Sequence, residues 1–244
     1  DPSADAGALE DVYDATRVPR EERGRLELPD REALLSRLRQ VRRDALDRLR
    51  RMDLEGHPLL EDGFVYRMLA QHEAQHQETI LQAVARMEDV AYEPAHRVAP
   101  PRGELPPDVE MVRIPPGPFP AGAGDDPAAY DNERPRHWVD LPAYWIDTAP
   151  VTNGDLLAFM EHGGYERREW WSEEGWAWLQ KERPAPHPLG WRAADGGWVE
   201  ERFGRVEPLV PSRPVLHVSA HEADAYARSV GKRLPTEFEW EKAA

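Results

Sequence analysis

Two histidines, His72 and His76, have the residue type and the spacing that metal chemistry requires. Side chains four residues apart on a helix are neighbours, with Cβ atoms about 5–6 Å apart, so both imidazoles can bind one cation. Neutral imidazole binds iron, copper, nickel and zinc, so the pair predicts a metal better than it identifies one. The alternative is a pair of surface histidines that make ordinary hydrogen bonds. We favour the metal because the pair lies on a row that continues into Leu69, Ile80 and Val84.

The same residues also fit a second kind of metal site. The run His72-Glu73-Ala74-Gln75-His76 matches H-E-x-x-H, the zinc-binding helix of metalloproteases, in which Glu73 would act as the general base. The residues after His76 do not supply the glycine and third histidine of the metzincin group. A zinc metalloprotease therefore stays open as an alternative function at this point.

Two predicted helices would carry and support the histidine pair. The first follows the turn Leu28-Pro29-Asp30 and repeats apolar residues at intervals of three and four, namely Leu34, Leu38, Val41, Ala45, Leu49 and Met52. The second is predicted from about Gly63 to Met87 and contains both histidines. Two long helices separated by a short Pro/Gly break are typical of an antiparallel bundle.

The composition of the chain changes across a proline-rich passage. All nine tryptophans lie between Trp138 and Trp240, whereas the helical part has none. The passage contains Pro94, Pro100-Pro101 and Pro106-Pro107, and it cannot continue a helix, so we predict a semi-rigid linker there. The predicted organisation is a helical domain over residues 1–93, a linker over 94–107 and a second domain over 108–244.

The second domain mixes short strands with helices. The predicted strands are Met111–Ile114 and Trp138–Leu141, and the predicted helices are Val151–Phe159 and a segment after Ser219. Thr152 or Asn153 can cap the first of these helices. We expect most of the remainder to be loop, which in an α+β domain is where function usually lies.

The overall composition excludes several classes of partner. A net charge of -15 would repel a phosphate backbone, so we expect no nucleic-acid partner. No segment approaches the ~18 apolar residues that a membrane helix needs, so we expect no membrane association. The chain has no cysteine, which rules out disulfides and cysteine ligands in these residues and allows a cytoplasmic location.

The second domain resembles the formylglycine-generating-enzyme (sulfatase-modifying factor) domain, which has a C-type-lectin-like fold. The resemblance covers about Val109 to the last residue. It rests on five runs: Met111-Val112-Arg113-Ile114-Pro115-Pro116-Gly117, Tyr130-Asp131-Asn132-Glu133-Arg134-Pro135, Pro150-Val151-Thr152-Asn153, Pro214-Val215-Leu216-His217-Val218-Ser219 and Gly231-Lys232-Arg233-Leu234-Pro235-Thr236-Glu237-Phe238-Glu239-Trp240.

Two further runs narrow the resemblance to one subgroup. Gly163-Gly164-Tyr165, followed by Trp170-Trp171-Ser172-Glu173-Glu174-Gly175-Trp176, resembles the members fused to a DinB-like four-helix bundle, which are the ergothioneine-type sulfoxide synthases. The run from His72 to Thr79 resembles the iron-binding helix of those synthases, especially the actinobacterial type. The implied fold is α+β in two domains, a DinB-like four-helix bundle followed by a C-type-lectin-like domain with much irregular structure.

The resemblance also implies a reaction and a metal. These synthases are non-heme Fe(II) enzymes that use O2 to join γ-glutamylcysteine or cysteine to the imidazole C2 of hercynine. Three histidines bind the iron in that family. His72 and His76 match two of them, and we expect the third in an N-terminal segment absent from this chain. We expect the chain to be a fragment, with the catalytic tyrosine beyond Ala244. Ovothiol-type and selenoneine-type synthases of the same family remain alternatives.

Three residues match substrate-binding positions of the family. Arg20 and Arg23 resemble the R-x-x-R segment that contacts the carboxylates of γ-glutamylcysteine. Guanidinium groups suit that role because each can hold a carboxylate through two parallel hydrogen bonds. Gln75 matches a position that helps hold the trimethylated histidine substrate, directly or through water. The expected partners are therefore small molecules.

Overall fold

A computed structural model of the chain describes residues 22, 29–87, 91–93, 110–126, 129–182 and 185–244. The chain divides into two compact units, Asp1–Asp62 and Gly63–Ala244, and each is described by itself. The linker predicted at residues 94–107 lies outside the described residues. The domain division at that linker therefore stays a prediction.

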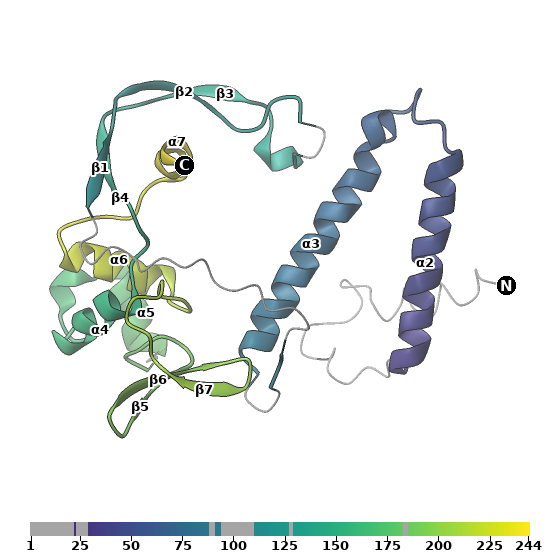
Figure 1. Ribbon diagram of the computed structural model, residues 1–244. Coiled ribbons are helices and arrows are strands. Elements are labelled where there is room, and N and C mark those ends of the chain that lie inside the picture. The colour runs from purple at the N-terminus through teal and green to yellow at the C-terminus, as the bar shows by residue number, and fades with distance from the viewer. Residues whose placement is uncertain (1–21, 23–28, 88–90, 94–109, 127–128, 183–184) are drawn as a thin grey trace. The chain divides into compact units, whose positions relative to one another are not determined.

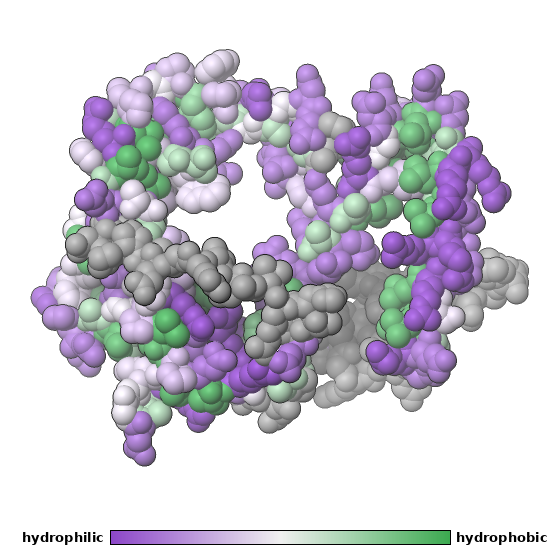
Figure 2. Space-filling view, viewed as in Figure 1, coloured by the Kyte–Doolittle hydropathy of each residue, from purple (hydrophilic) through white to green (hydrophobic). Residues whose placement is uncertain are grey.

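The first unit contains one described long helix, α2, which spans Arg31–Arg51 (Figure 1). Its N-cap is Asp30, whose Oδ1 accepts a hydrogen bond from the Ala33 N–H at 2.8 Å and so satisfies an N–H that the helix cannot. None of the described residues of α2 is buried. Leu38 and Val41 are more than half exposed, and apolar side chains stand among hydrophilic ones over this helix in Figure 2. The predicted first helix is confirmed.

The second unit begins with helix α3, Phe64–Ala85, which carries the histidine pair. A short 3-10 turn, η2 (Glu61–Gly63), leads into it, with Asp62 and Gly63 in the left-handed region. The predicted span of about Gly63 to Met87 is confirmed to within two residues. Since α2 and α3 belong to different units, the four-helix bundle remains a prediction.

After α3, the described residues of the second unit form three small antiparallel sheets. Strand β1 (Met111–Ile114) pairs with β4 (Tyr144–Asp147), and β2 (Gly117–Ala121) pairs with β3 (His137–Leu141). A third sheet has the order β5-β6-β7, formed by Trp191–Ala194, Gly197–Arg202 and Arg205–Pro208. Both predicted strands are confirmed. The third sheet was not predicted and lies where we expected loop.

Within the part of this unit that the structure describes, four helices accompany the sheets, and three of them begin with a capping box. The helices are α4 (Asn153–Glu161), α5 (Glu173–Glu182), α6 (Ala220–Ser229) and α7 (Glu237–Ala243), with short 3-10 turns η3 (Asp131–Glu133) and η4 (Arg168–Trp170). At α4, α6 and α7 a Thr or Ser N-cap exchanges hydrogen bonds with the acidic residue three positions later. Thr152, one of the two predicted caps, is the N-cap of α4. Helix α6 follows Ser219, also as predicted.

The buried core lies between α4, α5 and α6. Its buried residues are Leu156, Phe159, Tyr165, Trp171, Leu179 and Ala225. Trp171 is 2% exposed and its indole N–H donates to the Gly164 carbonyl oxygen at 2.8 Å, so it packs as a core residue. The mixed α and β architecture that we predicted is confirmed for this unit. No helix of the described segments is both long and apolar enough to cross a lipid bilayer.

Candidate metal centre

The two predicted metal ligands lie side by side on α3. The ring centroids of His72 and His76 are 4.4 Å apart and their planes meet at 65°. Both side chains are exposed, and neither imidazole makes a hydrogen bond to another described residue. The helical spacing therefore brings two imidazoles together on one turn, within reach of a single cation.

The helix around the pair contains further polar side chains. Glu73 and Gln75 are exposed on α3 between the two histidines. The Thr79 hydroxyl donates to the carbonyl oxygens of Gln75 at 3.1 Å and His76 at 3.0 Å, which ties this side chain to the turn that holds His76. Gln75 is thus placed one residue from a predicted ligand, accessible from outside the helix.

The pair fits part of a metal site. Two neutral imidazoles are suitable ligands for Fe(II) and for zinc, and both metals require at least one more protein ligand. Across the described ranges, no three His, Cys, Asp or Glu side chains gather closely enough to hold a metal ion. The described residues thus supply two of the ligands that such a site would need.

Two of the predicted substrate-binding residues are not tested by the structure. Arg20 and Arg23 lie outside the described residues, and their role stays a prediction. Another histidine, His57, lies in the connector between α2 and α3. It is exposed, and its Nδ1 accepts the Leu59 N–H at 3.2 Å. That hydrogen bond occupies one ring nitrogen of His57, in contrast with the rings of His72 and His76.

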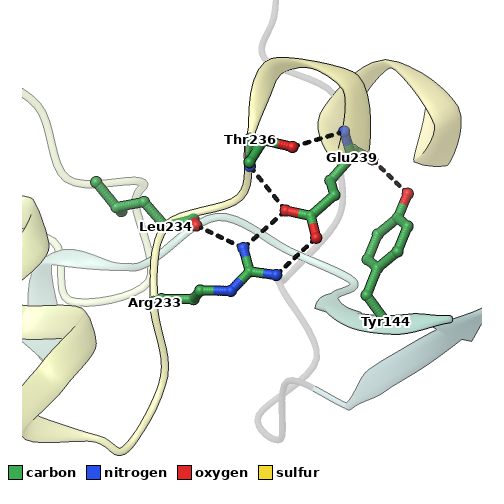
Figure 3. Close-up of polar contacts among 5 residues, drawn as sticks. All are labelled: Tyr144, Arg233, Leu234, Thr236 and Glu239. Atoms are coloured by element: carbon green, nitrogen blue, oxygen red, sulfur yellow. Dashed lines mark hydrogen bonds and ion pairs between the residues drawn. The ribbon is translucent and has the colours of Figure 1, made fainter. Parts of the chain in front are cut away.

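A buried carboxylate that the sequence did not single out organises the start of α7 (Figure 3). Glu239 is 5% exposed, and the Arg233 guanidinium donates to its two carboxylate oxygens at 2.7 and 2.6 Å. The Thr236 N–H donates to Oε2 at 2.8 Å, and the Tyr144 hydroxyl donates to the Glu239 carbonyl oxygen. The hydrogen bonds from Arg233 are the main cause that lowers the pKa of the Glu239 carboxyl to about 2.

A second buried carboxylate joins the core to α6. The Tyr165 hydroxyl donates to Glu222 Oε1 at 2.6 Å, and the Ser219 N–H donates to Oε2 at 2.7 Å. Burial and the hydrogen bond to Glu222 raise the pKa of the Tyr165 hydroxyl well above its usual value. Both buried carboxylates could have been found from the sequence, because each is the last residue of an S/T-x-x-E run. Both carboxylates accept hydrogen bonds from within the fold, so these groups stabilise the domain.

Comparison with known proteins matches residues 96–244 to one family and nearly the whole chain to one kind of enzyme. The model of the family described as Sulfatase-modifying factor enzyme 1-like domain matches residues 96–244. The chain is 42% identical over 241 residues to the hercynine oxygenase of Mycolicibacterium thermoresistibile, which covers 97% of this chain and 51% of that protein. It is also 42% identical over 238 residues to the hercynine oxygenase of Mycobacterium tuberculosis, covering 97% and 54%.

A second kind of relative is similar to a shorter part of the chain. The chain is 38% identical over 146 residues to the formylglycine-generating enzyme of Thermomonospora curvata, covering 55% of this chain and 48% of that protein. The chain spans about half the length of the curated relatives it matches. The similarity to hercynine oxygenases extends across α3, whereas the family model begins after it.

Proposed function

Because this chain belongs to the family with a sulfatase-modifying factor enzyme 1-like domain, we propose that it is part of a non-heme Fe(II)- and O2-dependent sulfoxide synthase. The reaction joins γ-glutamylcysteine or cysteine to the imidazole C2 of hercynine. The observation that carries the proposal is the His72–His76 pair, with ring centroids 4.4 Å apart on a helix inside the region similar to hercynine oxygenases.

In this proposal the two histidines hold the metal from one side. A third histidine from elsewhere in the full-length protein completes the ligand set, and residues 1–93 form part of a DinB-like four-helix bundle. When bound, Fe(II) supplies the activation of O2 and the lowered pKa of a coordinated thiol. His72 and His76 would hold the metal beside α3, and both side chains are exposed to solvent.

Other residues of this chain orient the two organic substrates. Arg20 and Arg23 hold the carboxylates of the thiol donor through charge-assisted hydrogen bonds. Gln75 is exposed beside His76 and can donate its amide N–H to the hercynine imidazole or to a bridging water. Holding both substrates at one place lowers the entropic part of the barrier, because the reacting atoms then meet without a further encounter. We also propose a cytoplasmic location, which the absence of cysteine from the chain allows.

One other class of function has support from a specific observation. The H-E-x-x-H run lies intact on α3, with Glu73 exposed beside His72, as a zinc metalloprotease would require. Against it, the similarity to hercynine oxygenases covers this helix and the domain that follows it. Ovothiol-type and selenoneine-type synthases share the metal chemistry and differ in the substrate pair.

A single set of reactions separates these functions. Full-length protein is loaded anaerobically with Fe(II) or with zinc and given hercynine plus γ-glutamylcysteine, cysteine or a selenosugar, or histidine plus cysteine. A parallel sample receives an unfolded protein as a peptidase substrate, and air is then admitted to all samples. Oxygen uptake and the product mass are then measured. We expect iron-dependent oxygen uptake and a sulfoxide of hercynine. Zinc-dependent peptide cleavage without oxygen uptake would contradict the proposal, and a product only from histidine or from the selenosugar would redirect it within the family.

The role of the histidines is tested by substitution. His72→Ala removes one of two adjacent ligands, so we expect iron content to fall at least tenfold and turnover to be lost. His57→Ala is the matched control, since this exposed histidine lies in the connector and should leave both quantities unchanged. A His72→Ala protein with normal iron and normal rate would rule out the proposed site.

A further inference from the structure

The C-terminal end of the histidine helix is completed by a residue far away in the sequence. The last four carbonyl groups of a helix have no partner within it. The carbonyls of Ala83 and Val84 accept hydrogen bonds from the residues directly after α3. The carbonyl oxygen of Ala85 instead accepts the Phe203 N–H at 3.0 Å, and Phe203 belongs to the turn between β6 and β7. This turn therefore acts as a cap for α3.

The shape of this turn explains why its backbone is available. Arg202 and Arg205 are paired across β6 and β7, so Phe203 and Gly204 are the two turn residues. Their φ angles are 53° and 67°, as a type I′ turn requires. Positive φ is costly for a side chain such as that of Phe203 and suits glycine at the next position. The cost is offset where the turn makes contacts that hold it.

Contacts on the other side of Phe203 hold the chain that leaves α3. The Phe203 carbonyl oxygen accepts the Tyr92 N–H at 3.1 Å, and the two aromatic rings lie 5.7 Å apart. Arg205 forms an ion pair with Glu93 at 3.3 Å, which is partly exposed and therefore adds little. Phe203 thus bonds to the end of α3 with its N–H and to the segment beyond with its carbonyl group.

The lowered pKa of His217 agrees with this attachment of α3. His217, beside the cavity lined by Arg202, has its pKa lowered by burial first, and then by the positive charges of Arg86 and Arg202. Arg86 is the C-cap of α3. The charge at the end of α3 therefore acts on His217, as expected if the helix end is attached to the β6–β7 turn.

We propose that Phe203 is a positioning residue for the metal site, and that the β6–β7 turn fixes the direction of α3 and so the place of His72 and His76. This inference rests on the function proposed above. An α-helix transmits displacements because it is stiff over this length, and Ala85 lies only about 13 Å along the axis from His76 at ~1.5 Å per residue. Misplacement of a reacting group by about 1 Å can cost about 100-fold in rate.

The test compares two glycines in the same sheet. Gly204→Val places a β-branched residue at a φ of 67°, which should distort the turn that caps α3. Gly196→Val is the matched control, because Gly196 has a φ of 97° in the neighbouring β5–β6 turn and open space around its missing Cβ. Phe203→Gly is a milder second variant, which keeps the backbone groups and the left-handed turn but removes the ring.

Two measurements are made on the full-length holoenzyme. Hydrogen exchange at Tyr92 reports the attachment, and kcat, KM and iron content report the site. For Gly204→Val we expect exchange at Tyr92 to rise at least tenfold and kcat to fall about tenfold, with iron content unchanged and KM within about twofold. Phe203→Gly should show both changes more weakly, and Gly196→Val should show neither.

The possible results distinguish the attachment of α3 to the β6–β7 turn from the effect of that attachment on the metal site. Unchanged exchange in Gly204→Val and Phe203→Gly would overturn the attachment. Faster exchange with an unchanged kcat would overturn the positioning role, and so would an equal loss of rate in Gly196→Val. If the wild-type protein has no iron-dependent turnover, the proposed function fails and this inference fails with it. Loss of rate only through loss of iron would assign the turn a purely structural role.

Discussion

The histidine helix and the tryptophan-rich domain use their polar residues in opposite ways. On α3 no described residue is buried, and the two histidines stand exposed without hydrogen bonds to described groups. In the domain that follows, the carboxylates of Glu222 and Glu239 are buried and fully engaged with neighbours. A side chain that forms no hydrogen bond within the protein is available to bind a ligand. A buried polar group whose hydrogen bonds are formed within the protein stabilises the fold instead. Substitutions of buried residues in this domain should therefore lower stability, whereas substitutions of the two histidines should lower metal binding.

The largest expected loss of stability comes from the core of the tryptophan-rich domain. Leu156 on α4 is 2% exposed and lies in the core, so Leu156→Ala should lower the free energy of unfolding by about 2–5 kcal/mol. Leu189→Ala is the same change at a residue that is 55% exposed, and should cost less than about 1 kcal/mol. Denaturant unfolding followed by tryptophan fluorescence measures both, since all nine tryptophans lie in this domain. Equal losses of unfolding free energy in Leu156→Ala and Leu189→Ala would contradict this prediction.

The next effect is expected at the Tyr165–Glu222 pair. Tyr165→Phe leaves one oxygen of a buried carboxylate without its hydrogen-bond donor, which should cost about 1.5–3 kcal/mol. Tyr226→Phe serves as the control, because no described group accepts a hydrogen bond from that hydroxyl. The same fluorescence-detected unfolding applies. A loss for Tyr226→Phe as large as for Tyr165→Phe would mean that the hydrogen bond to Glu222 is not the cause.

A smaller, pH-dependent effect is expected at Arg233. The folded-state pKa of Glu239 is about 2 and lies below the ordinary carboxyl value, so its contribution to stability is present above about pH 5 and is lost as the pH falls towards 2. Arg233→Met removes the main cause of this lowered pKa. We expect a loss of about 1–2 kcal/mol at pH 7 that shrinks on acidification. A constant difference between wild type and variant from pH 7 to pH 3 would contradict this assignment.

The smallest effect on stability is expected at the metal ligand itself. His72 is exposed and unbonded, so His72→Ala should change the free energy of unfolding of the metal-free protein by less than about 0.5 kcal/mol. The same variant should lose its iron. Circular dichroism of the apoprotein, read beside metal analysis, checks both statements. A large destabilisation of the apoprotein would show that the ring packs structurally.

Local patterns in the sequence predicted the elements that depend on local physics. Apolar periodicity predicted α2 and α3, and the cap at Thr152 and the start of α6 after Ser219 followed from side-chain chemistry. The β5–β7 sheet was missed, although Gly196 and Gly204 mark its two turns. The histidine pair was found because its geometry is set within one turn.

Contacts between distant segments could not be read from the sequence in the same way. Three contacts of this kind are the Tyr165–Glu222 hydrogen bond, the Tyr144–Glu239 hydrogen bond and the Phe203 cap of α3, and the separation of their residues carries no periodic signal. Each depends on how the chain folds back on itself, which packing decides. Arg20, Arg23 and the bundle depend on residues outside those described.

The hydrogen bond between Phe203 and Ala85 can form only after both of these segments have been synthesised. On the ribosome, α3 emerges long before the β6–β7 turn, so the growing chain must carry an uncapped helix end with two adjacent imidazoles facing water. Slow translation between these segments would prolong that interval and expose the nascent helix to adventitious cations. The end of α3 is therefore completed only after the β6–β7 turn has been synthesised and has folded.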